Sequence, residues 1–297
     1  MGVQVNVAGR NTKAHSAPMV PQKPIPGDTY LRMPGAPPGE VINSLLFSFT
    51  SLISFQARRV DDPTTCSEAF HQIRSSAKRV RAFLKLTAAV TPASQRKHLA
   101  VSVSKLKDSV AHARDRDVLI LRLKELCGEH SADTIQPAAL HPGGKMIQPL
   151  ARNLEAGVAS LHLQKLSRRD VLREISISYT RAWAMFLACR KKPHDERLHE
   201  WRKHVKILQF QCVAFSEIDP LAVTGFRASV LARLLGDHHD FTVMEGHLQK
   251  TKKRRKQNLK KIAKRKSSLV KSALKAGKFL FCLTPREFAA GLAKGTP

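Results

Sequence analysis

Residues 69–85 read AFHQIRSSAKRVRAFLK, and this stretch decides the fold. At 3.6 residues per turn, its cationic side chains fall at steps of three and four and therefore share one face of a helix. Apolar residues follow the same steps one position earlier, about 100° around the helix, where they would pack in a core. The cationic row is His71, Arg74, Lys78, Arg81 and Lys85, and the apolar row is Phe70, Ile73, Ala77, Val80 and Leu84. No acid interrupts the stretch, so its charges repel one another, and a long polyanion lying along the helix would relieve that repulsion.

A second stretch, LHEWRKHVKIL at residues 198–208, has the same pattern. Its His199, Arg202 and Lys206 are spaced like the first three cations of the earlier row, with Lys203 beside them. An acidic motif follows each stretch at a similar distance, as RDRDV at 114–118 and as HHDFTV at 238–243. Two motifs that recur in the same order, at nearly the same offset, predict an internal duplication. We therefore expect helices over 66–89 and 195–216 to occupy equivalent places in two repeats.

The composition favours an all-α protein with a polyanionic partner. Of 297 residues, 42% are hydrophobic and only 6% aromatic, and no run of Val, Ile and Thr indicates strands. The formal net charge of +28 is not needed for a core, and it points to nucleic acid, an anionic membrane or another polyanion. The five cysteines are scattered without a C-x-x-C pair, and the start of the chain has no secretory signal. A soluble cytoplasmic protein is therefore expected.

Changes in composition divide the chain into five parts. Residues 1–39 are rich in Pro and Gly and lack periodicity, residues 128–145 hold the Pro and Gly of a linker, and Lys and Arg dominate from residue 250. We predict a disordered tail over 1–39, a first helical repeat over 40–127, a linker over 128–145, a second helical repeat over 146–250 and a strongly basic tail over 251–297. Each half supplies about four helices, which is enough for an antiparallel bundle.

With both cationic helices and both acidic motifs in view, the chain resembles the CHAD family, the conserved-histidine α-helical domain. The match rests on His71 to Arg74 and Lys78 to Arg81, on the motif at 114–118, on Leu198 to Lys206 and on Leu235 to Asp240, and it covers roughly residues 40–250. The resemblance implies two tandem, pseudo-symmetric four-helix bundles around a basic groove. It also implies binding of inorganic polyphosphate, association with polyphosphate granules, no cofactor and no established catalysis.

The cationic rows and the resemblance together predict a set of polyphosphate-binding residues. They are His71, Arg74, Lys78, Arg81, Lys85, Arg114, His199, Arg202, Lys203, Lys206 and His239. Gln209 stands in the second repeat where Arg81 stands in the first, so the two halves would share the ligand unequally. A lone row of this kind is usually a solvated face, but its recurrence and the net charge of the chain favour ligand contact. For His71 and His199, a structural role and a phosphate contact remain equally open.

The sequence DHHD at 237–240 also permits a metal-dependent phosphohydrolase, since His and Asp are common metal ligands. Adjacent His238 and His239 point about 100° apart on a helix, which makes joint ligation awkward. The first repeat has Ala113 and Arg114 instead, and Arg is not a ligand. We therefore favour pairing with cations at a junction between a helix over 221–236 and one that begins at 239.

The remaining alternative is a non-specific nucleic-acid-binding protein that uses the same charge. The basic run at 250–266 would then add affinity for any polyanion, or dock on an anionic membrane through the segment Phe279 to Phe281. The chain has no recognisable nucleic-acid-binding motif and few aromatic side chains for stacking bases. It also has no phosphate-binding glycine loop and no G-x-S-x-G motif, so a non-enzymatic binding protein is preferred.

Overall fold

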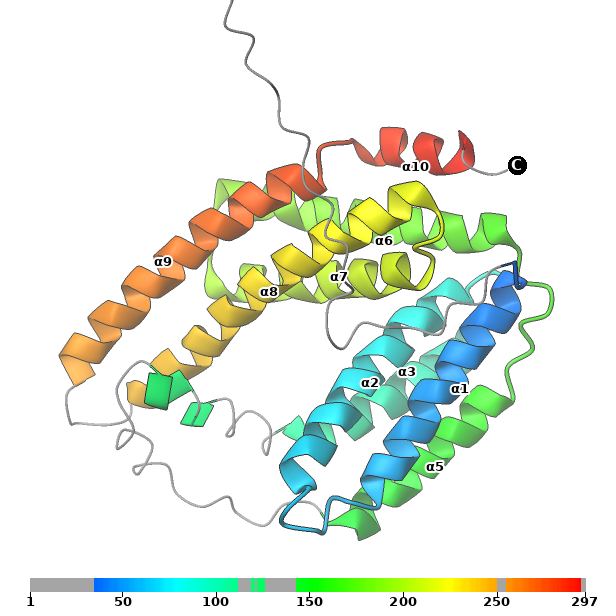
Figure 1. Cartoon of the computed structure of the whole chain (residues 1–297), viewed down its shortest axis with the longest axis horizontal. Coiled ribbons are helices and arrows are strands. Elements are labelled where there is room, and N and C mark those ends of the chain that lie inside the picture. Colours follow the sequence, from blue (N-terminus) through cyan, green and yellow to red (C-terminus); the bar gives the residue numbers. More distant parts are fainter. Residues whose placement is uncertain (1–34, 112–118, 121, 126–142, 250–254, 295–297) are drawn as a thin grey trace, which may run out of the picture.

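The computed structural model of the chain describes residues 35–111, 119–120, 122–125, 143–249 and 255–294. Within these ranges all regular structure is helical, as the sequence predicted (Figure 1). The helices are α1 (Pro38–Ala57), α2 (Cys66–Leu86), α3 (Ala93–Ser109), α5 (Gly144–Ala159), α6 (Arg168–Lys191), α7 (Asp195–Ala214), α8 (Asp219–Leu248), α9 (Arg255–Leu280) and α10 (Pro285–Lys294). Residues 1–34 of the predicted disordered tail and most of the linker lie outside the described residues, and α1 begins at Pro38, within the last two residues of the predicted tail.

Local sequence explains where several of these helices begin. α1 and α8 carry Pro at their first or second position, where the fixed φ of Pro suits a helix start and its missing N–H is not needed. Ser167 caps α6: its hydroxyl accepts from the backbone N–H of Asp170, whose carboxylate accepts from the backbone N–H of Ser167 in turn. The two cationic helices α2 and α7 match their predicted ranges to within three residues at each end.

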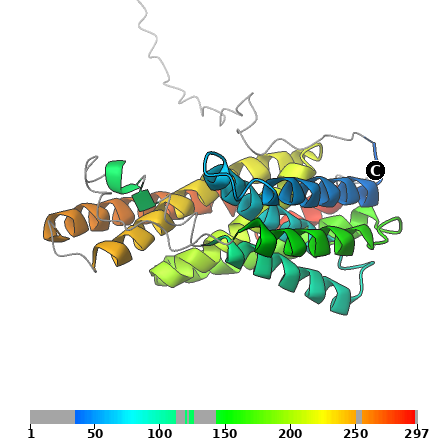
Figure 2. The same cartoon turned by 90° about the horizontal axis from the view of Figure 1, so that it is seen from below.

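The first four-helix ring consists of α1, α2, α3 and α5. Each helix of this ring packs on two others, because α2 contacts α1 and α3 while α5 contacts α3 and α1. Figure 1 shows these four helices side by side, and they stay together in the view from below (Figure 2). This partnership differs from the predicted division, which placed residues 146–166 in the second repeat. The 3.6-residue period of α5 indicates which of its faces is buried but not which helices bury it.

The second ring consists of α6, α7, α8 and α9, and α10 packs on α6 outside it. We predicted a strongly basic tail from residue 251, but this segment packs on the second ring as α9 and α10 and buries Ile262, Ala273, Leu280, Phe288 and Leu292. α8 is also one continuous helix of 30 residues, so the junction predicted at 237–238 does not exist.

The two rings share one hydrophobic core. A single cluster of buried side chains includes Leu46 and Phe83 of the first ring and Tyr179 and Trp201 of the second. A smaller cluster lies at the far end of α8 and α9, where Leu123, Phe241, Met244 and Ile262 are buried. The rings therefore form one folded unit, and the tandem duplication remains a prediction from the sequence.

Candidate functional site

The two cationic helices meet where the rings join. α2 packs on α7, and the fully buried amide of Gln211 donates to the backbone carbonyl of Ala82 at 2.9 Å. Arg79, which is only 8% exposed, places its guanidinium 5.4 Å from the ring centroid of Phe49 and 5.2 Å from that of Phe210. Cation–π contacts of this kind stabilise a buried guanidinium. These contacts hold α2 across α7 in a defined orientation.

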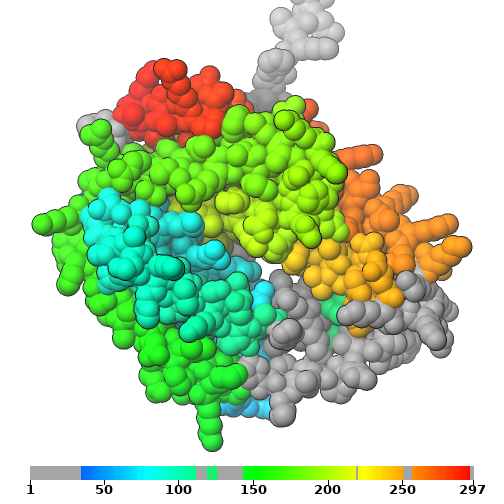
Figure 3. Space-filling model, turned by 180° about the vertical axis from the view of Figure 1, so that it is seen from behind, coloured from blue at the N-terminus to red at the C-terminus, as the bar shows by residue number. Residues whose placement is uncertain are grey.

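The predicted site residues on α2, α7 and α8 retain access to solvent. His71, Arg81 and Lys203 are exposed, and Arg74, Lys78, Lys85, His199, Arg202, Lys206 and His239 are half-buried. Figure 3 shows the surface of α2 and α3, in cyan, next to the yellow-green surface of α6 and α7. Arg114 lies outside the described residues. We call the ten described side chains the basic surface.

His199 of α7 and His239 of α8 form a close pair inside the basic surface. Their Nδ1 atoms lie 3.1 Å apart and their ring centroids 4.3 Å apart. One imidazole donates in such a contact and the other accepts, so the accepting ring is neutral. Burial lowers the pKa of His199, and the charges of Lys203 and Arg202 lower it further. The charge of Lys78 on α2 also lowers the pKa of His199, so a cation of the first row acts electrostatically on a residue of the second row.

A second convergence of charge lies further along α2. Burial lowers the pKa of Lys85, and the nearby charges of Arg181 on α6 and Arg81 lower it further. Burial also lowers the pKa of His204 on α7, to which Lys85 and Arg181 contribute. Arg96 of α3 adds to the effect on Lys85. Sequence reasoning missed Arg181 and Arg96 because neither belongs to a repeated row.

Acids from the fold partly compensate the basic surface. The Lys203 ammonium lies 2.6 Å from a carboxylate oxygen of Glu200, and both side chains are about half exposed. Burial favours the neutral form of Asp108 on α3, but hydrogen bonds within α3 and the charge of Arg74 lower its pKa overall. Glu174 of α6 acts against burial and the cations, in the direction that raises the pKa of Lys85. The cations of the basic surface nevertheless outnumber these three acids.

Comparison with known proteins gives the family. The CHAD domain family model matches residues 55–249, which is more than half of the chain. This chain belongs to the CHAD family. The family is associated with binding of inorganic polyphosphate, and its domains are generally non-catalytic. No curated protein matches the sequence.

A solved CHAD structure has the same fold. The crystal structure of the CHAD domain from the plant Ricinus communis superposes with a TM-score of 0.51 at 19% sequence identity. The alignment covers 87% of this chain and 92% of the plant chain. The CHAD family model ends at residue 249, whereas in this structure α9 lies beyond it and completes the second ring. Among the described helices, none is long and apolar enough to cross a bilayer.

The two adjacent histidines of the DHHD segment face different partners. His238 is buried, with Nε2 3.6 Å from a carboxylate oxygen of Asp195, and the Lys266 ammonium lies 2.6 Å from both Asp195 and Glu245. His239 points instead to His199. The described part of the chain holds no group of three or more potential metal ligands. Asp195, Glu245 and Lys266 thus form an ion-paired contact among α7, α8 and α9, against which His238 lies.

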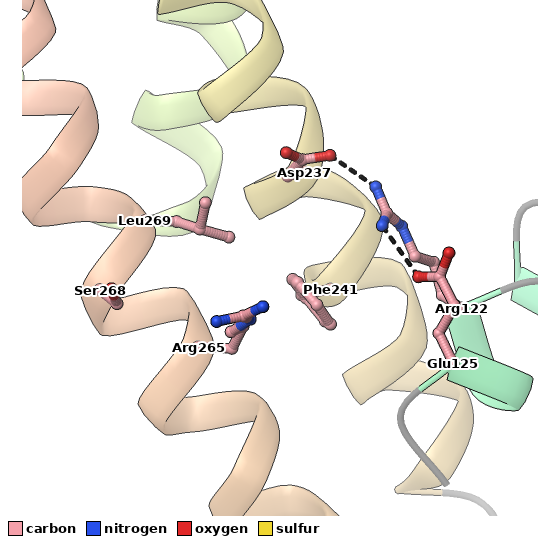
Figure 4. Close-up of a pocket in the computed structure, with 7 residues that line it drawn as sticks. All are labelled: Arg122, Glu125, Asp237, Phe241, Arg265, Ser268 and Leu269. Atoms are coloured by element: carbon pink, nitrogen blue, oxygen red, sulfur yellow. Dashed lines mark hydrogen bonds and ion pairs between the residues drawn. The ribbon is translucent and has the colours of Figure 1, made fainter. Parts of the chain in front are cut away.

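The acids of the same DHHD segment pair with a cation, as predicted, but within a helix and not at its start. Arg122 lies 2.5 Å from Asp237 and 3.5 Å from Asp240, both of which belong to the interior of α8. Arg122 and Asp237 line a cavity of about 320 Å³, shown in Figure 4. Its lining residues are Arg122, Glu125, Asp237, Phe241, Arg265, Ser268 and Leu269. The cavity has acids and bases in balance, unlike the basic surface.

Proposed function

We propose that the protein binds inorganic polyphosphate, without converting it, on the basic surface where α2 crosses α7. One observation carries this proposal: cations from four different helices lie close together, so that Lys78 of α2 helps to lower the pKa of His199 on α7, and Arg181 of α6 and Arg96 of α3 help to lower the pKa of Lys85 on α2. Holding like charges together costs stability unless a ligand of opposite charge binds there. Membership of a family associated with polyphosphate binding supports the same function.

A linear polyanion fits this surface better than a small one. The row on α2 runs from His71 to Lys85, which at 1.5 Å per residue spans about 20 Å along the helix. Arg can bind a phosphate through two parallel hydrogen bonds, whereas Lys acts as a mobile point charge. The surface carries both types along its length, so a bound chain would meet cations at repeated intervals. Arg114, outside the described residues, is proposed to extend it.

We further propose that the protein associates with polyphosphate granules. A granule presents many chains at once, and an exposed row of cations can bind any one of them without a defined end. This placement rests on the binding function and on the family.

The test is a competition titration of the purified full-length chain. We expect long-chain polyphosphate to displace a labelled single-stranded DNA of equal charge, and its affinity to fall steeply as salt rises, because binding releases counterions. Fluorescence anisotropy of the labelled DNA measures the displacement. Preference for the DNA at every salt concentration would contradict the proposal and favour the nucleic-acid-binding alternative.

We expect acidification to strengthen polyphosphate binding. A bound polyanion favours the protonated form of His71, His199 and His239, so binding is coupled to proton uptake. By linkage the affinity must rise as the pH falls from about 8 to 5, a range that extends below 6.5 because burial and nearby cations lower the pKa of His199 in the free protein. Calorimetry at three pH values measures this change, and H199N/H239N should reduce it. An affinity that does not change over this range would contradict a role for the histidines.

The free protein is expected to respond to acid in the opposite sense. Burial lowers the pKa of His199, His204 and His238 below the usual value near 6.5. As the pH falls below about 6.5, the unfolded state takes up protons before the folded state does. The stability that these neutral histidines provide is therefore present above that pH and is lost as the pH falls through their folded pKa. Thermal unfolding in the same buffers, without polyphosphate, separates the two effects.

A further inference from the structure

α9, which contributes no side chain to the basic surface, presents a second cationic face. The helix contains no acid, and its apolar side buries Ile262, Ala273 and Leu280. Exposed lysines lie on the other side at steps of three, four and seven, within a stripe about 100° wide. We call this stripe the lysine face: Lys256, Lys260, Lys264, Lys271, Lys275 and Lys278. Figures 1 and 2 both show α9 at the end of the molecule away from the first ring.

Large apolar side chains are exposed where the lysine face ends. Arg227 of α8 donates to the backbone carbonyl of Phe279 at 3.0 Å and lies 3.4 Å from the Cys282 sulfur, so this part of α8 lies against the end of α9. Four exposed large apolar residues lie within four positions of Arg227, Phe279 or Cys282 in the sequence. They are Val223 and Phe226 of α8, Phe279 of α9 and Leu283 in the connection that follows α9, exposed by 42%, 38%, 59% and 43%, and we call them the apolar corner.

The fold holds the apolar corner rigidly in solvent. Leu280 and Phe281, which the sequence analysis grouped with Phe279, are buried, and the ring of Phe281 packs 5.3 Å from that of Tyr179. The Tyr179 hydroxyl donates to the backbone carbonyl of Leu283 at 2.8 Å. The backbone on both sides of Phe279 is thus fixed to the second ring. The exposure of the Phe279 side chain therefore results from the fold and not from an unpacked chain terminus.

From this juxtaposition we infer that the lysine face and the apolar corner together bind an anionic lipid surface. A lipid surface offers negative headgroups beside hydrocarbon, and stable peripheral binding needs both an electrostatic and an apolar contribution. Nucleic acid would use the lysines but leaves aliphatic Val223 and Leu283 without a partner. The lysine face also contains Lys and no Arg, whereas Arg is preferred for bidentate recognition of single phosphates. The inference does not depend on the polyphosphate function.

The test uses the full-length chain and sedimentation with vesicles. We expect binding to vesicles of 70% phosphatidylcholine and 30% phosphatidylserine and none to pure phosphatidylcholine. The variant K271Q/K275Q/K278Q should bind roughly a hundredfold more weakly, at about fivefold for each lysine. The variant F279S/L283S should bind about tenfold more weakly, since it loses apolar area that would enter the membrane. All five side chains are exposed, so the variants should fold, which circular dichroism verifies.

A second measurement separates lipid insertion from charge alone. In F279W the added indole should shift its emission to shorter wavelength with the anionic vesicles, beyond any change in the wild-type protein. Variants of the basic surface should still bind vesicles, and the two α9 variants should still bind polyphosphate, so failure of one function is distinguishable from failure of the other. The inference is overturned if the wild type ignores anionic vesicles, if neither α9 variant weakens binding, or if F279W shows no shift.

Discussion

Polyphosphate binding is expected to disappear when four cations of the basic surface are reversed, as R74E/K78E/R202E/K206E. A charge-assisted hydrogen bond contributes about 1.5–3 kcal/mol, so loss of even two or three corresponds to roughly a thousandfold in affinity. Reversal also adds repulsion toward the phosphates. The two residues on α2 and the two on α7 lie on helices that pack together, so the substitution removes charge from both sides of the crossing. Calorimetric titration with long-chain polyphosphate at fixed salt measures the change.

A matched variant controls for the loss of net charge. Reversal of four exposed cations on α5 and before or at the start of α6, K145E/R152E/K165E/R168E, changes the charge of the chain equally. Its affinity for polyphosphate should stay within a few-fold of wild type, because these four reversals change only the long-range electrostatic field of the protein. Arg74 and Arg202 are half-buried, so charge reversal there could disturb folding. Circular dichroism of the reversal variant, and of the milder variant R74Q/K78Q/R202Q/K206Q, checks that folding is retained. Wild-type affinity in the folded charge-reversal variant would refute the proposed site.

Deletion of residues 255–297 is expected to unfold the second ring. This segment buries Ile262, Leu280, Phe281, Phe288 and Leu292. A fully buried apolar side chain contributes about 1.5–3 kcal/mol, so these five alone are worth about 10 kcal/mol. That amount is comparable to the whole stability of an ordinary domain, about 5–15 kcal/mol. Size-exclusion chromatography and thermal unfolding by circular dichroism measure the outcome.

The same deletion uncovers the centre of the second ring. A Cβ at Gly277 would lie 2.7 Å from Phe186 and 2.9 Å from Trp201, which shows how closely the α9 backbone covers these two rings. The charge control is K271Q/K275Q/K278Q, which removes three lysines and no buried side chain, and it should unfold at the wild-type temperature. A soluble truncated chain with unchanged cooperative unfolding would instead mean that residues from 255 on are the detachable tail that the sequence suggested.

The sequence by itself determined the local features of this protein. The apolar rows of α2 and α7 predicted both helices, and Phe70, Ile73, Trp201 and Val205 are buried as their period required. Such a row can be predicted from the sequence because residues three and four positions apart share a face in any helix. The two cationic motifs also placed the chain in its family before any packing was known, and the family match confirms it.

Only the tertiary structure decided which helices are partners. Nothing in the periodicity of α5 or α9 assigns them to a ring, because an amphipathic stripe indicates a buried face and not the surface that covers it. The same holds for charge. Asp108, Glu174 and Arg181 interact with the cationic rows from other helices, so neither row alone predicted the electrostatic balance of the basic surface. The contact between His199 and His239, 40 residues apart, likewise depends on how α7 packs against α8. Local periodicity is set by backbone geometry, whereas these pairings are set by packing between distant segments.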